Sequence, residues 1–288
     1  MKAELVLDAR AQLGEGLLWD VDTQLLYWID IPGQKLHRFN PADGSNSSMD
    51  VGQQIGCISL CEEGGLIAGM TDGIYEIDFE GQIMKCVYQP AQGMEGLRFN
   101  DGKCDASGRF MLGTMGIAGQ KELVGSFYRY DGVKGTLDEL LHPVYISNGL
   151  AWTEDNRTMY YSDTTRTLWA FDYDVQNSAI SNRRAIATIP EGEGFSDGLT
   201  IDEEGMLWVA QYNGGCVGRY NPHTGEKIDE VSVGAHSATC CAFGGKDMDE
   251  LYITTVAARA DTQKYPYAGG LFMVKPGVRG RVAYKFKK

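Results

Sequence analysis

The sequence predicts an all-β protein, a six-bladed β-propeller that residues 1–288 form as a single domain. No segment keeps a helical period of 3.6 residues for twelve residues. Short apolar or alternating runs recur instead, separated by turns rich in glycine, aspartate and asparagine. Related segments also return along the chain near Glu15, Ile55, Asp101, Asn148, Asp197 and Thr239. Their spacing of about 40 to 50 residues matches the length of a four-stranded propeller blade.

Each unit begins with a polar residue, a glycine and an apolar run. The clearest copies are Glu15-Gly16-Leu17-Leu18-Trp19, Asn148-Gly149-Leu150-Ala151-Trp152 and Asp197-Gly198-Leu199-Thr200-Ile201. An acidic turn, an aromatic strand and a third strand follow; in the first unit these strands are residues 25–29 and 35–39. We expect a leading strand at residues 4–7 and a trailing strand at 281–286 to close the ring and leave no exposed edge.

The polar residue before each glycine should occupy the same place in its own blade, so Glu15, Asn148 and Asp197 should converge on the propeller axis. The more polar segment Asn100-Asp101-Gly102 should bring Asn100 or Asp101 to the same point. Two carboxylates 4 Å apart repel by roughly 4 kcal/mol at an effective dielectric constant near 20. A bound divalent ion, a shared proton or Arg98 must offset this repulsion, unless these residues only cap turns.

Carboxylate and amide oxygens suit Ca²⁺, Mg²⁺ or Mn²⁺, and they also hold Fe²⁺ or Zn²⁺. We therefore expect one divalent metal ion in the central channel, with its identity open. Arg98 precedes Asn100 by two residues, so both side chains should face the same way on a strand.

The composition excludes some partners and indicates a compartment. A net charge of −13 argues against binding to nucleic acid or to an anionic membrane. No run approaches the roughly 18 apolar residues of a membrane span, and the first residues lack the apolar core of a signal peptide. The seven cysteines contain no CxxC pair, so we expect reduced thiols in a cytoplasmic protein.

Two further patterns have structural interpretations. Residues 194–198 match the GxSxG pattern of serine hydrolases, but that motif requires a helix after the serine, and a strand pattern follows here. Asp105, Asp155 and Asp202 follow the first strand of their units, and we expect them to be solvated turn residues.

Several stretches, in this order and spacing, resemble the SMP-30/gluconolactonase/luciferin-regenerating enzyme family. They are Leu13-Gly14-Glu15-Gly16, Arg98-Phe99-Asn100-Asp101-Gly102-Lys103, Gly113-Thr114-Met115, Ile146-Ser147-Asn148-Gly149-Leu150, Asp197-Gly198, Leu207-Trp208-Val209-Ala210 and Tyr212-Asn213-Gly214-Gly215. The similarity extends from about residue 8 to the last blade.

The resemblance implies a six-bladed propeller with one divalent ion in the axial channel, bound by Glu15, Asn148 and Asp197. Arg98 and Asn100 would hold a sugar lactone, with Asn100 beside the metal, and Asp197 would also be the catalytic base. The implied reaction is the metal-dependent hydrolysis of aldonolactones to aldonic acids, without an organic cofactor. Residues 116–121 lack the acidic residue that some animal members carry there, which leaves the preferred lactone open.

Two alternatives remain at this stage. A related metal-dependent esterase could act on an organophosphate or another ester with the same metal, and a non-catalytic, regucalcin-like propeller could bind calcium. The sequence leaves open the sugar, its ring size, the metal and the oligomeric state. It also leaves open whether Asp197 or a metal-bound hydroxide is the effective base.

Overall fold

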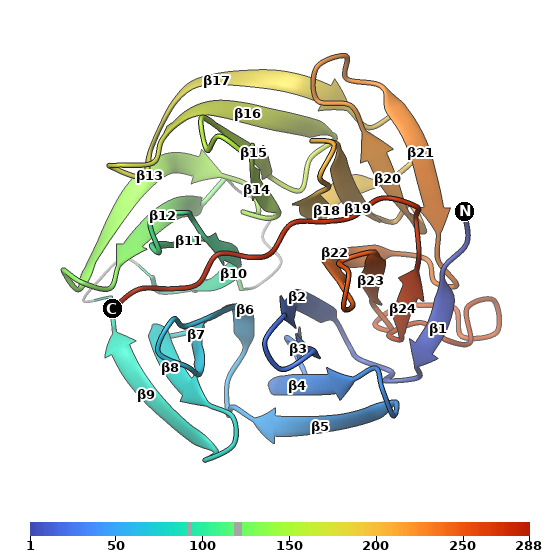
Figure 1. The fold of residues 1–288 in the computed structure, drawn as a ribbon, viewed down its shortest axis with the longest axis horizontal. Helices are drawn as coiled ribbons and strands as arrows, with labels where there is room; N and C mark the ends of the chain where they lie inside the picture. The colour runs from blue at the N-terminus through green and yellow to red at the C-terminus, as the bar shows by residue number, and fades with distance from the viewer. Residues whose placement is uncertain (91–93, 118–122) are drawn as a thin grey trace.

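The computed structural model describes residues 1–90, 94–117 and 123–288, and it consists of six four-stranded antiparallel sheets around a central axis (Figure 1). The first three blades contain β2 (Gly14–Asp20), β3 (Leu25–Asp30), β4 (Lys35–Asn40) and β5 (Ser45–Asp50); β6 (Ile55–Leu60), β7 (Leu66–Met70), β8 (Ile74–Asp78) and β9 (Ile83–Tyr88); and β10 (Leu97–Cys104), β11 (Phe110–Gly116), β12 (Gly125–Asp131) and β13 (Thr136–Val144). The predicted six-bladed propeller is confirmed.

The other three blades follow in chain order. They contain β14 (Leu150–Trp152), β15 (Thr158–Ser162), β16 (Thr167–Asp174) and β17 (Ala179–Thr188); β18 (Phe195–Ile201), β19 (Leu207–Tyr212), β20 (Cys216–Tyr220) and β21 (Lys227–Ser232); and β22 (Ala238–Gly244), β23 (Glu250–Thr255), β24 (Leu271–Val274) and β1 (Glu4–Leu7). The innermost strands of the six blades are β2, β6, β10, β14, β18 and β22 (Figure 1).

The two ends of the chain have different roles. The leading strand β1 pairs with β24, with Leu5 opposite Phe272, and completes the sixth blade as expected. The expected trailing strand is wrong, because β1 already occupies the outer edge of β24. Residues 281–286 instead cross one end of the channel (Figure 1). Phe286 N–H donates to the Leu60 carbonyl oxygen at 2.7 Å, which ties this segment to the second blade.

The described part of the chain contains no helix, and therefore none that could span a membrane. In particular, Ser196 lies within strand β18, where its hydroxyl donates to the Thr165 carbonyl oxygen at 2.8 Å and contacts the Ser162 hydroxyl at 2.7 Å. The strand-to-helix turn of a serine hydrolase is therefore absent here, as the sequence predicted. All seven cysteines are free thiols.

Bulges in the innermost strands shape the channel. In β18, Ser196 pairs with Gln211 and Leu199 with Val209, so Asp197 and Gly198 share one partner residue. The equivalent shift occurs at residues 16–17 of β2 and at residues 100–101 of β10. Neighbouring inner strands approach closely here, because a Cβ atom on Gly198 would lie 2.9 Å from Cys240 Cα. Glycine after the polar residue thus lets the blades meet at the axis.

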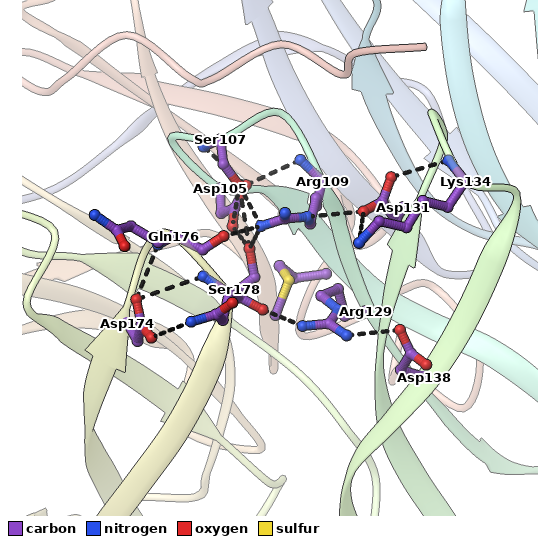
Figure 2. Close-up of polar contacts among 12 residues, drawn as sticks. Asp105, Ser107, Arg109, Arg129, Asp131, Lys134, Asp138, Asp174, Gln176 and Ser178 are labelled. Atoms are coloured by element: carbon purple, nitrogen blue, oxygen red, sulfur yellow. Dashed lines mark hydrogen bonds and ion pairs between the residues drawn. The ribbon is translucent and has the colours of Figure 1, made fainter.

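The expectation of solvated aspartates after the inner strands holds for Asp155 but is wrong for Asp105 and Asp202, which are fully buried. Figure 2 shows Asp105 within a polar network between the third and fourth blades. Tyr173 Oη donates to Asp105 Oδ2 at 2.6 Å, and Arg109 N–H donates to Oδ1 at 2.9 Å. Asp202 accepts from Trp208 Nε1 at 2.9 Å. The carboxyl groups of Asp105 and Asp202 therefore hold these turns in place, and their hydrogen bonds compensate for the cost of burying them.

Candidate metal centre

The predicted site residues come from four blades and lie early in the innermost strands. Glu15 is the second residue of β2, Asn100 lies at the bulge of β10, Asn148 lies two residues before β14, and Asp197 lies in β18. All four are buried, and Asn148 has only 3% of its surface exposed. The repeat therefore places one polar side chain of each of these blades at the same level of the channel.

Thr164 fixes the orientation of the Asn148 amide. Asn148 Nδ2 lies 2.7 Å from Thr164 Oγ1, and this hydroxyl lies 3.3 Å from the Ile146 carbonyl oxygen. Because the hydroxyl has one proton and donates it to Ile146, it accepts from Asn148. Thr164 holds this position with φ of 37°, a costly backbone conformation for a β-branched residue. The amide therefore keeps its Oδ1 free, and this buried atom has no hydrogen-bond partner among the described residues.

Arg98 and Asn100 form a hydrogen-bonded pair on one face of β10, as their spacing predicted. Arg98 Nη1 donates to Asn100 Oδ1 at 2.7 Å and to the Phe99 carbonyl oxygen at 2.9 Å. Asn100 Nδ2 donates to the Ser147 carbonyl oxygen at 2.8 Å, next to Asn148. The amide oxygen of Asn100 is thus engaged by Arg98, whereas the amide oxygen of Asn148 is unpartnered.

The charges of three buried carboxyl groups, those of Glu15, Asp101 and Asp197, act on one another in this region. Burial raises the pKa of Glu15 well above its usual range, and the charges of Asp197 and Asp101 raise it further. Burial and the charge of Asp101 likewise raise the pKa of Asp197, although contact with Asn148 opposes this rise. Arg98 also favours the ionised form of both groups, and burial lowers its own pKa to about 10. The single positive charge of Arg98 does not balance the three carboxylates when they are ionised.

The donor set fits a hard divalent cation. Asn148 Oδ1 is an oxygen ligand without another partner, and Glu15 and Asp197 supply negative charge beside it. No three His, Cys, Asp or Glu side chains come together as a metal site in residues 1–90, 94–117 and 123–288. An ion at this position therefore requires the amide oxygen in addition to the two carboxylates.

Sequence reasoning missed the residues that hold the site in place. Asp30 Oδ2 accepts from the Gln12 N–H at 3.0 Å and its Oδ1 from the Leu13 N–H at 3.1 Å, just before Glu15. Asp163 Oδ1 accepts in the same way from the N–H groups of residues 145 and 146, just before Asn148. Asp30 is the last residue of the second strand of its repeat and Asp163 directly follows the second strand of its own, so their matched positions were a usable signal.

The loop that the sequence associates with the lactone preference is described only at Gly116 and Ile117, since residues 118–121 lie outside the described residues. The sequence left open whether Asn100 or Asp101 reaches the metal centre, and in the structure both residues contribute to this region. Asn100 belongs to the Arg98 pair, whereas Asp101 Oδ1 accepts from the Gly102 N–H at 2.7 Å and its charge acts on Glu15 and Asp197.

Comparisons with known proteins agree with this architecture. The pattern of the SMP-30/Gluconolactonase/LRE-like region matches residues 13–257. The YvrE protein of Bacillus subtilis strain 168, whose name proposes a sugar lactone lactonase, is 39% identical over 276 residues, 94% of each chain. Regucalcin of Danio rerio is 34% identical, over 99% of this chain and 98% of its own.

Solved structures show the same fold. A luciferin-regenerating enzyme superposes with a TM-score of 0.93 at 30% identity, covering 99% of both chains. A calcium-binding protein, regucalcin of Agrobacterium tumefaciens, also gives a TM-score of 0.93, at 24% identity, covering 100% of this chain and 98% of its own. The chain therefore belongs to the SMP-30/gluconolactonase/LRE-like family.

Proposed function

We propose that this protein is a divalent-metal-dependent lactonase that hydrolyses sugar lactones of the aldonolactone class to aldonic acids. The observation that carries the proposal is the buried, unpartnered Asn148 Oδ1 beside the carboxyl groups of Glu15 and Asp197. Membership of the family and the similarity to YvrE support the reaction class.

Glu15, Asn148 and Asp197 would hold the ion through two carboxylates and one amide oxygen. Such an ion polarises a lactone carbonyl group and stabilises the negative charge that develops on its oxygen. The preset amide of Asn148 serves this role because Thr164 already holds it. Little reorganisation is then needed at this ligand when the site fills.

Asp197 would accept the proton of the attacking water, because a carboxylate buried beside the reacting group is a suitable general base. Arg98 would donate to the hydroxyl and ring oxygens of the sugar from a position that Asn100 fixes. Together with Asn100 it would hold the lactone with its carbonyl group toward the centre of the site, which lowers the entropic cost of reaction.

The test is a pH-indicator screen of five- and six-carbon sugar lactones with Ca²⁺, Mg²⁺, Mn²⁺, Zn²⁺ and Fe²⁺, scored above spontaneous hydrolysis. We expect turnover that chelation abolishes and that added metal restores. Simple esters and organophosphates belong in the same screen, because a preference for them would replace the sugar-lactone assignment with the esterase one.

The relatives named regucalcin make a non-catalytic calcium-binding propeller the second candidate. The same samples distinguish the two functions. If calcium raises the melting temperature and no lactone is hydrolysed with any of the five ions, the metal centre is a binding site only, and the lactonase proposal is wrong.

A further inference from the structure

Beyond the candidate metal centre, the axial channel contains a cavity of about 110 Å³. Every inner strand that carries a metal-site residue continues into its wall. Glu15 is followed by Trp19, Asn148 by Trp152 and Asp197 by Ile201, and all three later residues line the cavity. Four residues of strand span about 13 Å. The cavity therefore begins beside the metal-site residues, where Gly16 and Asp101 line it, and extends along the inner strands away from them.

The crossing segment Arg281–Tyr284, here called the strap, forms the outer wall of this cavity. The strap is held on both sides of the channel. Gly280 N–H donates to the Met248 carbonyl oxygen at 2.8 Å, and Phe286 N–H donates to the Leu60 carbonyl oxygen at 2.7 Å. Figure 1 shows the strap running across the inner strands between these anchors. A molecule in the cavity would thus be enclosed between the strap and the blades.

Most of the cavity wall is hydrocarbon. Trp19, Trp152, Ile201 and Phe243 are buried residues that line it, and Val282 covers it from the strap. Protein interiors are packed to a density that leaves few voids larger than one water molecule. A buried apolar space of about 150 Å³ is known to take up a benzene molecule, so this smaller cavity suits an apolar group no larger than a benzene ring.

The unpartnered polar groups on the lining residues are mainly donors. The buried atoms Trp19 Nε1, Trp152 Nε1 and Arg281 Nη1 have no acceptor in the described part of the chain. The other terminal nitrogen of Arg281, Nη2, makes a long ion pair of 3.7 Å with the exposed side chain of Glu154 and donates to the Glu203 carbonyl oxygen at 3.5 Å. A ligand that satisfies these donors must carry a hydrogen-bond acceptor, and the positive charge of the Arg281 guanidinium favours an anionic acceptor.

Lys103 and Asp101 indicate at which end the anion belongs. Lys103 Nζ donates to the Leu199 carbonyl oxygen at 2.5 Å across the channel, and its positive charge acts on Asp101. Asp101 Oδ2 is also unpartnered, and it lies beside the metal centre. The metal-site end of the cavity thus already contains a carboxylate with its own counter-ion. A second anion is favoured only at the opposite end, beside Arg281.

We propose that this cavity is a second ligand site, distinct from the metal centre, that binds a small carboxylate with a compact apolar body about the size of benzoate. The apolar body fills the space among the inner strands, and the carboxylate faces Arg281 on the strap. This site does not depend on the lactonase activity, since it uses none of the residues that act on the lactone.

Benzoate itself is the probe, titrated into the metal-loaded protein by calorimetry and by tryptophan fluorescence, because two of the five tryptophans line the cavity. We expect one benzoate per chain. Arg281→Gln should weaken binding by about tenfold or more, because a charge-assisted hydrogen bond is lost. Val282→Phe should also weaken it by filling the cavity from the half-exposed strap position. The matched control Val133→Phe, at a surface turn, should leave binding unchanged.

Benzyl alcohol has the same ring without the charge, and it should bind about tenfold more weakly than benzoate. Absence of any benzoate binding would show that the cavity holds only water and would overturn the proposal. Binding that both Arg281→Gln and Val282→Phe leave intact would place benzoate elsewhere and overturn it equally. If chelation of the metal or an added aldonate abolishes benzoate binding, the ligand sits in the metal centre, and the second site is wrong.

Discussion

Replacement of Thr164 by valine tests how the metal centre is oriented. The change keeps the β-branched shape and its strained backbone position but removes the hydroxyl that accepts from Asn148 Nδ2 at 2.7 Å. Asn148 is 97% buried, so its amide N–H would be left without an acceptor. A buried unsatisfied group costs about 1–3 kcal/mol, and we expect a loss of this size in the free energy of unfolding.

The same substitution should weaken metal binding. Loss of the partner that orients a ligand typically costs 10- to 100-fold in metal affinity, or about 1.4–2.7 kcal/mol. Calorimetric titration with Ca²⁺ and Mn²⁺ measures this change, and melting temperatures with and without the ion separate it from the loss of stability. Thr165→Val is the matched control, because that hydroxyl contacts the backbone of Thr167 and not Asn148. If Thr164→Val is less stable but binds both ions as tightly as the wild type, Asn148 is not a ligand.

The remaining predictions concern catalysis, substrate binding and pH. Asp197→Asn should lower the turnover of sugar lactones by about 100-fold or more while part of the metal affinity survives, with Asp155→Asn as an exposed control; near-normal turnover would place the base elsewhere. Arg98→Met should raise KM for sugar lactones more than for unsubstituted lactones, and a loss of metal binding with unchanged KM would assign Arg98 to structure instead. Burial lowers the pKa of His37 to about 4, below the value near 6.5 of an unfolded chain, so its contribution to stability is present above pH 6.5 and is lost between pH 6.5 and 4. Urea unfolding at pH 8 and pH 5 should therefore show that the wild type loses about 2 kcal/mol more of its free energy of unfolding on acidification than His37→Gln does. Equal losses in the two proteins would contradict the neutral, buried imidazole.

The six-bladed architecture could be predicted because the sequence repeats at the inner strands of the blades. The residues near Glu15, Asn148 and Asp197 share a polar residue, a glycine and an apolar run, and the structure places all three at the axis. A repeated local pattern fixes a repeated environment, so the position of these residues at the innermost strands could be predicted without coordinates. The roles of these residues in metal binding and catalysis remain predictions.

Other features could not be predicted, because their causes lie in neighbouring blades. From the sequence alone Asp105 resembles a solvated turn residue. In the structure its carboxylate accepts hydrogen bonds from Tyr173 and Ser178 of the next blade. Thr164 has no motif, and its importance depends on the direction of one amide group. The strap has no regular period, since it contacts several blades rather than one partner strand. Arg281 contacts Glu203 of the fifth blade, and Tyr284 contacts Ser59 of the second blade and Asn156 of the fourth.

The pairing of β1 with β24 has a consequence for synthesis on the ribosome. Leu7 lies opposite Leu271, about 260 residues further along the chain. At 5–20 residues per second, β1 waits about 13 to 50 seconds for its partner strand to be made. During that time the segment Leu5-Val6-Leu7 is an unpaired apolar strand, accessible to chaperones and to other nascent chains. A chain stalled before residue 271 would have five complete blades and an open sixth, so cellular quality control should treat it as unfinished.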